Sequence, residues 1–135
     1  MSFLLDTNLV SELERRRPNV GVLRWFDRVR PGDLHLSVLT IGEIRRGIER
    51  VRPRNPTRAA GLETWLAGLR VSFRERILPI DAAIAEQWGR LNDPNPAPIV
   101  DSLLAATALV HDWTVVTRNA VDFDRTEVRV LNPFE

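Results

Sequence analysis

Cysteine and lysine are both missing from this sequence of 135 residues. Without cysteine the protein can have neither a disulfide framework nor a thiolate metal site, and a reducing, cytoplasmic location is the simpler expectation. All 19 basic residues are arginine. This excludes sites that need a lysine on a nucleotide phosphate or a lysine amine for Schiff-base catalysis.

Long apolar runs are missing as well. No stretch approaches the length of a transmembrane helix, so we expect no membrane association. The first apolar run has no basic segment before it and no small-residue cleavage site after it, so we do not expect a signal peptide. The length suits one domain, residues 1–135, with a single sizeable core.

Charge is nearly balanced over the chain, at a net +1, but it is unevenly distributed. Residues 45–76 hold nine arginines and three acids, whereas residues 77–135 hold four arginines and nine acids. This separation suits a protein that attracts an anion and also binds cations. For any single run of charge, an ordinary solvated helix face is the alternative explanation.

Short apolar runs alternate with helical patterns along the chain. This alternation predicts an α/β fold, with about five mainly parallel strands and helices on both faces of the sheet. Pro79 places its strand at the sheet edge. Trp25 is expected at the edge of its helix, and Trp88 is expected to be buried. The strands are expected near residues 2–5, 33–38, 77–81, 113–117 and 127–131, the helices near 8–16, 20–29, 40–51, 59–73, 82–91 and 99–111, and a stiff loop at 92–98.

Two acidic residues have both a capping and a functional interpretation. Asp6 ends the first apolar run, so it either caps the next helix or forms part of a site at the carboxyl edge of the sheet. Glu43 follows Thr40 by three residues, which is the spacing of a capping box. Glu43 would equally lie at a helix N-terminus on the same edge of the sheet.

Asp101 is harder to explain by capping alone. It lies in the first turn of an almost wholly apolar helix, where burying a carboxylate without a partner costs free energy. A bound cation would compensate this cost. Asn119 and Asp122 follow the strand at 113–117, so parallel topology brings them to the same edge as the other acids. Oxygen donors without cysteine or histidine favour Mg²⁺ or Mn²⁺. His35 has no neighbouring ligand and is expected to be packed or partly exposed rather than catalytic.

Five segments, in this order, carry a family resemblance: residues 3–8, Glu43 with Gly47, residues 101–108, residues 115–123 and residues 130–134. Together they resemble PIN-domain ribonucleases over nearly the whole chain. The sequence is most similar to VapC-type toxins of bacterial type II toxin–antitoxin modules, and its last segment resembles their FitB-like branch.

The resemblance implies a metal-dependent endoribonuclease that hydrolyses RNA phosphodiesters with a metal-activated water. Asp6, Glu43 and Asp101 would be the acidic cluster that holds the metal ion. Thr7 and Thr117 would support the site through their hydroxyls, and Asn8 would help to shape the first loop. The position of the family's fourth acid is occupied by Asn119, and Asp122 lies three residues further on. Asparagine offers a carbonyl oxygen but no negative charge.

The resemblance also implies partners. A cognate antitoxin would cover the acidic site, the toxin would form a homodimer, and the substrate would be RNA, such as tRNA or another structured RNA. Arg46, one turn beyond Glu43, and Arg50 are the candidates for contacts to the RNA backbone. Two alternatives remain open: a PIN nuclease for RNA maturation without an antitoxin, and a catalytically inactive PIN-like binding module.

Overall fold

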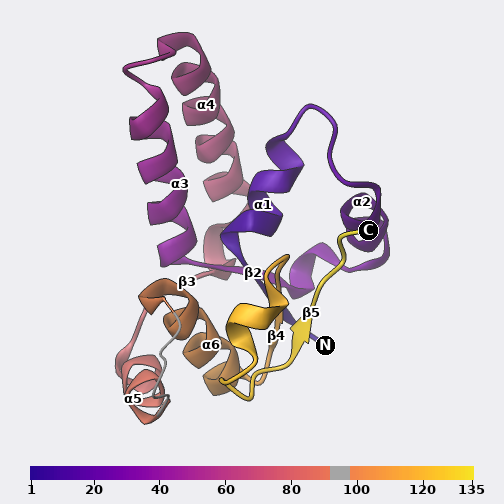
Figure 1. The fold of residues 1–135 in the computed structure, drawn as a ribbon, viewed down its shortest axis with the longest axis vertical. Helices are drawn as coiled ribbons and strands as arrows, with labels where there is room; N and C mark the ends of the chain where they lie inside the picture. Colours follow the sequence, from indigo (N-terminus) through magenta and orange to yellow (C-terminus); the bar gives the residue numbers. More distant parts are fainter. Residues whose placement is uncertain (92–97) are drawn as a thin grey trace.

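A five-stranded sheet lies at the centre of the computed structural model, which describes residues 1–91 and 98–135 (Figure 1). The strands are ordered β3-β2-β1-β4-β5, and every neighbouring pair is parallel. Their bounds are β1 (Phe3–Leu5), β2 (Leu34–Ser37), β3 (Ile77–Leu78), β4 (Thr114–Val116) and β5 (Val130–Leu131). The predicted parallel sheet is confirmed, with strands shorter than expected.

Helices cover both faces of this sheet, as predicted. α3 and α4 pack against each other and project together from the sheet (Figure 1). Across residues 1–91 and 98–135, no helix combines the length and the apolar character needed to cross a membrane. The helices are α1 (Thr7–Glu14), α2 (Val20–Arg28), α3 (Val38–Val51), α4 (Pro56–Phe73), α5 (Ala82–Arg90) and α6 (Ile99–His111), and the 3₁₀ turns are η1 (Pro31–Asp33), η2 (Arg74–Arg76) and η3 (Ala120–Phe123).

The central strand β1 divides the core between the two faces. Side chains alternate along a strand, so Phe3 and Leu5 pack with α1 to α4 while Leu4 packs against α6. Leu4 and Leu5 are fully buried. β1 is thereby fixed on both sides, which holds the residue at its carboxyl end, Asp6, in a defined place.

Some sequence predictions need correction. Trp25 is buried rather than at the helix edge, and its ring packs edge-on against Phe3 with centroids 5.1 Å apart. Trp88 is 41% exposed rather than buried, because α5 has its largest packing contact with α6 and leaves its other side open. β3 lies at the sheet edge, as Pro79 predicted. Most of the expected loop at 92–98 falls outside the described residues.

Candidate metal centre

Asp6 lies at the carboxyl end of β1 and is also the N-cap of α1. Its backbone N–H donates to the carbonyl of Val116 on β4 at 2.9 Å, and its Oδ1 accepts from the backbone N–H of Thr7 at 2.7 Å. The capping interpretation is therefore confirmed. The same carboxylate is almost fully buried and faces other acidic side chains, so capping does not account for its whole environment.

Two polar side chains hold the second oxygen of Asp6. The hydroxyl of Thr117, fully buried just beyond β4, donates to Asp6 Oδ2 at 2.8 Å. The amide of Asn8 donates to the same oxygen at 3.2 Å, and its Oδ1 accepts from the backbone N–H of Arg118 at 3.1 Å. Asn8 thus joins the loop after β1 to the loop after β4, which fixes the orientation of the Asp6 carboxylate.

The predicted capping box of Thr40 and Glu43 is wrong. α3 begins at Val38, and its N-cap is Ser37, whose Oγ accepts from the backbone N–H of Leu39 at 3.0 Å. Glu43 therefore lies beyond the first turn, where its carboxylate accepts a hydrogen bond from the hydroxyl of Thr7. Glu43 has no role in capping α3 and is directed toward the loop that carries Asp6.

Asp101 lies in the first turn of α6, half-buried, and its carboxylate has no hydrogen-bond or ion-pair partner among the residues that the structure describes. The pKa of Asp101 is raised to about 6, mainly by burial and in addition by the negative charges of Asp6, Asp122 and Glu43. Burial also raises the pKa of Asp6, against the lowering effect of its hydrogen bonds from Thr117 and Thr7. The charges of Glu43 and Asp122 add to the increase at Asp6.

Asp122, rather than Asn119, adds charge to this cluster. Asp122 lies in η3, and its carboxylate raises the pKa of both Asp6 and Asp101. Asn119 acts through its backbone, since its N–H donates to the Thr117 hydroxyl at 3.0 Å and its carbonyl accepts from the N–H of Asp122 at 3.0 Å. The two candidates therefore occupy different places in the same network.

The donor set fits a hard divalent cation. Four carboxylates act on one another electrostatically, from the end of β1, from α3, from α6 and from η3, and none of them forms an ion pair with a described arginine. Oxygen donors of this kind favour Mg²⁺ or Mn²⁺. Over residues 1–91 and 98–135, however, no three acidic or histidine side chains are close enough to hold a metal ion as they stand. At least one of these side chains would have to shift for three donors to reach the same ion.

Both histidines lie apart from this cluster. His35 and His111 each stack on Trp113, with ring centroids 3.9 and 4.4 Å apart. His35 Nδ1 lies 3.3 Å from the carbonyl of Phe3, and burial lowers the pKa of His35. The expectation that His35 is packed is confirmed.

The sequence matches the PIN domain family over residues 3–128. The chain belongs to the PIN-domain family. Among known relatives, toxin FitB of Neisseria gonorrhoeae is 33% identical over 97% of both chains. The crystal structure of FitAcB from that organism superposes with a TM-score of 0.87, at 32% identity over 97% of each chain.

Two further proteins resemble this PIN domain over almost their full lengths. A VapC ribonuclease, Y4jK of Sinorhizobium fredii, is 28% identical over 98% of this chain and 97% of its own. A chain in a toxin–antitoxin complex from Klebsiella pneumoniae superposes with a TM-score of 0.70, at 27% identity over 99% of each chain.

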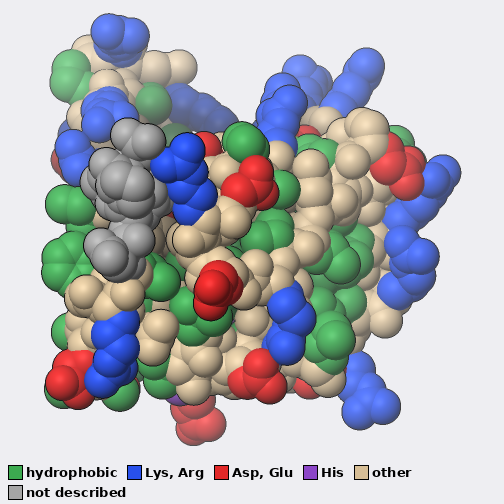
Figure 2. Space-filling model, turned by 60° about the horizontal axis from the view of Figure 1, so that its bottom comes forward, with side chains coloured by type: hydrophobic (Ala, Val, Ile, Leu, Met, Phe, Trp, Pro, Cys, Tyr) green, Lys and Arg blue, Asp and Glu red, His purple; other side chains and the backbone are tan. Residues whose placement is uncertain are grey.

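Arg46 and Arg50 lie on α3 of the PIN domain, exposed and without an ion-pair partner in the described part of the chain. Their neighbours Arg45 and Arg52 are neutralised by Glu49 and Glu63, with Arg52 Nη2 2.9 Å from Glu49 Oε2. The basic region predicted from the sequence is therefore partly compensated by acids. On the face shown in Figure 2, many arginine side chains project at the margins, and acidic side chains lie singly among basic and apolar ones.

The sequence interpretation missed Thr40 as part of the site. Thr40 is fully buried in α3, and its hydroxyl lies 3.3 Å from that of Thr7. Its spacing from Glu43 suggested a helix start, and only the position of Ser37 shows that the helix begins earlier. A second group that was missed consists of Arg15, Arg16 and Arg17 near the end of α1, together with Arg58 of α4.

Proposed function

We propose that this PIN domain is a metal-dependent endoribonuclease that acts as the toxin of a type II toxin–antitoxin module. The observation that carries the proposal is the meeting of four carboxylates at the carboxyl edge of the sheet, two of them with raised pKa values and none neutralised by a described arginine. The cost of holding these charges together is explained if the site binds a divalent cation.

In this proposal Asp6, Glu43 and Asp101 hold Mg²⁺ or Mn²⁺, and Asp122 adds negative charge beside them. Such an ion supplies positive charge that promotes the ionisation of water and stabilises the charge that develops on the phosphate. Thr117 and Asn8 keep the Asp6 carboxylate in one orientation, and Thr7 positions Glu43. Arg46 and Arg50 attract the RNA backbone from the exposed side of α3.

The partner in this proposal is an antitoxin that covers the acidic site. The support comes from the relatives, one of which is named a toxin, another a VapC ribonuclease, and a third observed in a toxin–antitoxin complex. A homodimer remains a prediction. Because the substrate is RNA, the protein would act in the cytoplasm.

The first test is cleavage of a broad RNA pool by the purified protein with Mg²⁺ or Mn²⁺, compared with EDTA. Asp101→Asn removes one metal ligand without changing the size of the side chain, and we expect it to reduce cleavage by at least about a hundredfold, as loss of transition-state charge stabilisation does elsewhere. The matched control is Asp27→Asn, which removes an exposed carboxylate on α2 and should retain full activity.

Equal cleavage by Asp101→Asn and the parent would contradict the proposal. Parent protein that is folded, free of antitoxin and inactive on every RNA would instead favour the inactive binding module. Cleavage restricted to an RNA precursor, without an antitoxin gene beside the toxin gene, would favour a nuclease of RNA maturation.

A further inference from the structure

Four arginines surround one cavity at the end of α1. Arg15, Arg16 and Arg17 form the bend that follows α1, and Arg58 reaches the same place from the first turns of α4. The cavity has a volume of about 540 Å³. Residues far apart in the sequence therefore create a concentrated positive surface that the acidic site does not include.

Buried and half-buried glutamates hold this bend in place. Glu12 is almost fully buried, and its Oε2 accepts from the backbone N–H of Asn19 at 2.8 Å while its Oε1 lies 3.4 Å from Arg15 Nη1. Glu14 pairs with Arg58 through both of its oxygens, at 2.6 and 2.7 Å. Glu12 therefore holds both ends of the bend, and the Glu14–Arg58 pair joins α1 to α4. These contacts make the cavity a fixed feature of the fold.

The cavity carries an excess of positive charge. Glu12 and Glu14 compensate Arg15 and Arg58, whereas Arg16 and Arg17 are exposed and have no ion-pair partner within residues 1–91 and 98–135. A guanidinium group presents a planar set of donors that matches the oxygens of a phosphate. The two free arginines therefore suit a phosphate group better than a metal ion or an apolar ligand.

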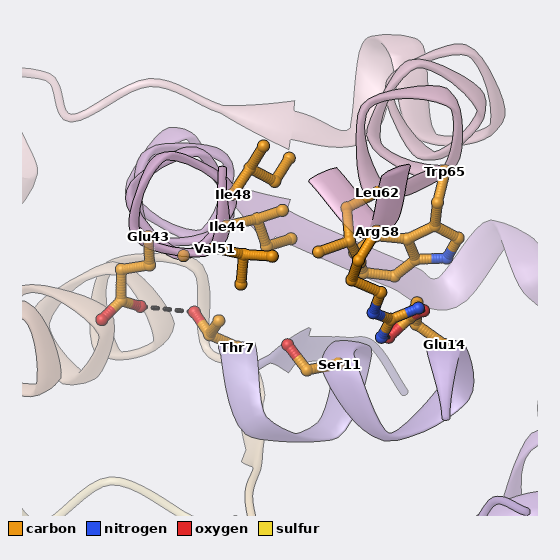
Figure 3. A pocket seen from close by; sticks show the side chains of 11 residues that line it. Thr7, Ser11, Glu14, Glu43, Ile44, Ile48, Val51, Arg58, Leu62 and Trp65 are labelled. Carbon is orange, nitrogen blue, oxygen red and sulfur yellow. Dashed lines mark hydrogen bonds and ion pairs between the residues drawn. The ribbon is translucent and has the colours of Figure 1, made fainter. Parts of the chain in front are cut away.

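A groove connects this cavity with the acidic site. The groove lies between α1, α3 and α4 and has a volume of about 260 Å³. At one end are Thr7 and Glu43, and at the other is the Glu14–Arg58 pair, which borders the arginine cavity (Figure 3). Trp65 lies in its wall and offers a surface for a base. From Thr7 to Arg15 the helix spans about 12 Å, at a rise of about 1.5 Å per residue.

We propose that the cavity formed by Arg15, Arg16, Arg17 and Arg58 binds a backbone phosphate of single-stranded RNA a few nucleotides from the cleaved bond. The inference rests on the proposed ribonuclease function and extends it, because it assigns the path of the substrate along the groove. Charge favours RNA at both ends of this path, with phosphates held by arginines at one end and by a cation among carboxylates at the other. An acidic segment of a partner protein is the rival occupant.

Binding is measured in the Asp101→Asn background, which is expected to slow cleavage strongly, with a short fluorescent single-stranded RNA over a range of salt concentrations. The test variant is Arg16→Gln combined with Arg17→Gln. The matched control is Arg30→Gln combined with Arg90→Gln, which removes the same charge from exposed arginines outside the cavity and the groove. We expect the test variant to bind roughly tenfold more weakly and to lower the slope of log K against log salt by about 1, with the control close to the parent.

A second measurement uses the active protein on RNAs of different length. The Arg16→Gln, Arg17→Gln variant should cleave a long RNA with lower kcat/KM, but it should cleave an RNA too short to reach the cavity as fast as the parent does. Unchanged binding and cleavage of long RNA by this variant would overturn the inference while leaving the ribonuclease intact. If the variant binds RNA normally but loses affinity for a polyglutamate peptide, the cavity belongs to a protein partner and the inference is wrong. If the parent neither binds nor cleaves RNA, the proposed function itself fails.

Discussion

At the scale of single residues, the acidic site contains carboxylates that stabilise the fold and carboxylates whose burial destabilises it. Asp6 contributes to folding as the cap of α1, with hydrogen bonds that favour its charged form. Asp101 has no such partners among the described residues, so its burial and its acidic neighbours are uncompensated. Removing the charge of Asp101 should therefore stabilise the folded protein when no metal ion is bound.

We predict that Asp101→Asn stabilises the metal-free protein at neutral pH. The pKa of Asp101 is about 6 in the folded chain, above its usual value near 3.8, so the folded state binds more protons than the unfolded state between these pH values. The contribution of Asp101 to stability is therefore present below about pH 4 and is lost as the pH rises through about 6. Asparagine has no proton to lose.

This prediction is tested by denaturant unfolding in EDTA from pH 4 to pH 8. The advantage of Asp101→Asn over the parent should grow up to about pH 6 and then stay constant. Asp27→Asn should show no such trend. A variant less stable than the parent at every pH would mean that the Asp101 carboxylate makes a favourable interaction in the folded protein.

At the scale of elements, the start of α3 decides whether Glu43 can serve the site. Ser37 ends β2 and caps α3, so the cap lies three residues before Thr40, the first residue of the apparent capping box. This earlier start places Thr40 inside the helix and turns Glu43 toward Thr7. Because Ser37 caps the helix, the Glu43 carboxylate, nearly two turns further along, is free to serve the site.

We predict that Ser37→Ala lowers the free energy of unfolding by about 1 kcal/mol, because it removes the side chain that accepts from the backbone N–H of Leu39. Glu43→Gln, in contrast, should change stability little, because it is not part of the cap. Both values come from urea unfolding at neutral pH. A larger loss for Glu43→Gln than for Ser37→Ala would contradict this prediction and would mean that the Glu43 carboxylate itself stabilises the fold.

At the scale of the whole molecule, the acidic site joins the two layers of the fold. α3 belongs to the layer on one face of the sheet and α6 to the layer on the other, and Asp6 ends the central strand between them. A cation bound by Glu43, Asp6 and Asp101 would connect α3, the central strand β1 and α6. Metal binding should therefore stabilise the entire domain rather than one loop.

We predict that Mn²⁺ or Mg²⁺ raises the melting temperature of the parent and that EDTA reverses the increase. A ligand that binds only the folded state at a hundred times its Kd adds about 2.7 kcal/mol to stability. Asp101→Asn should lose this shift and Asp27→Asn should keep it. An equal shift in both variants would place the metal ion elsewhere.

Much of the architecture follows from the sequence. Apolar runs ending in Asp6 and at Thr117, alternating with helical patterns, predict a parallel sheet whose carboxyl edge collects the acids, and Pro79 predicts the edge strand. These signals act within a few residues or follow from the handedness and direction of the connections, so they can be recognised without knowing the packing. They place Asp6, Glu43 and Asp101 at one edge, but they do not show what each carboxylate touches.

Tertiary structure alone decides the contacts between distant residues. Thr7 meets Glu43 across 36 residues and Asn8 meets Thr117 across 109, and these hydrogen bonds fix how the carboxylates are directed. The arginine cavity likewise depends on the packing of α4 against α1, which brings Arg58 to Glu14. Local patterns carry no information about such pairs, because each pair depends on how whole helices pack on the sheet.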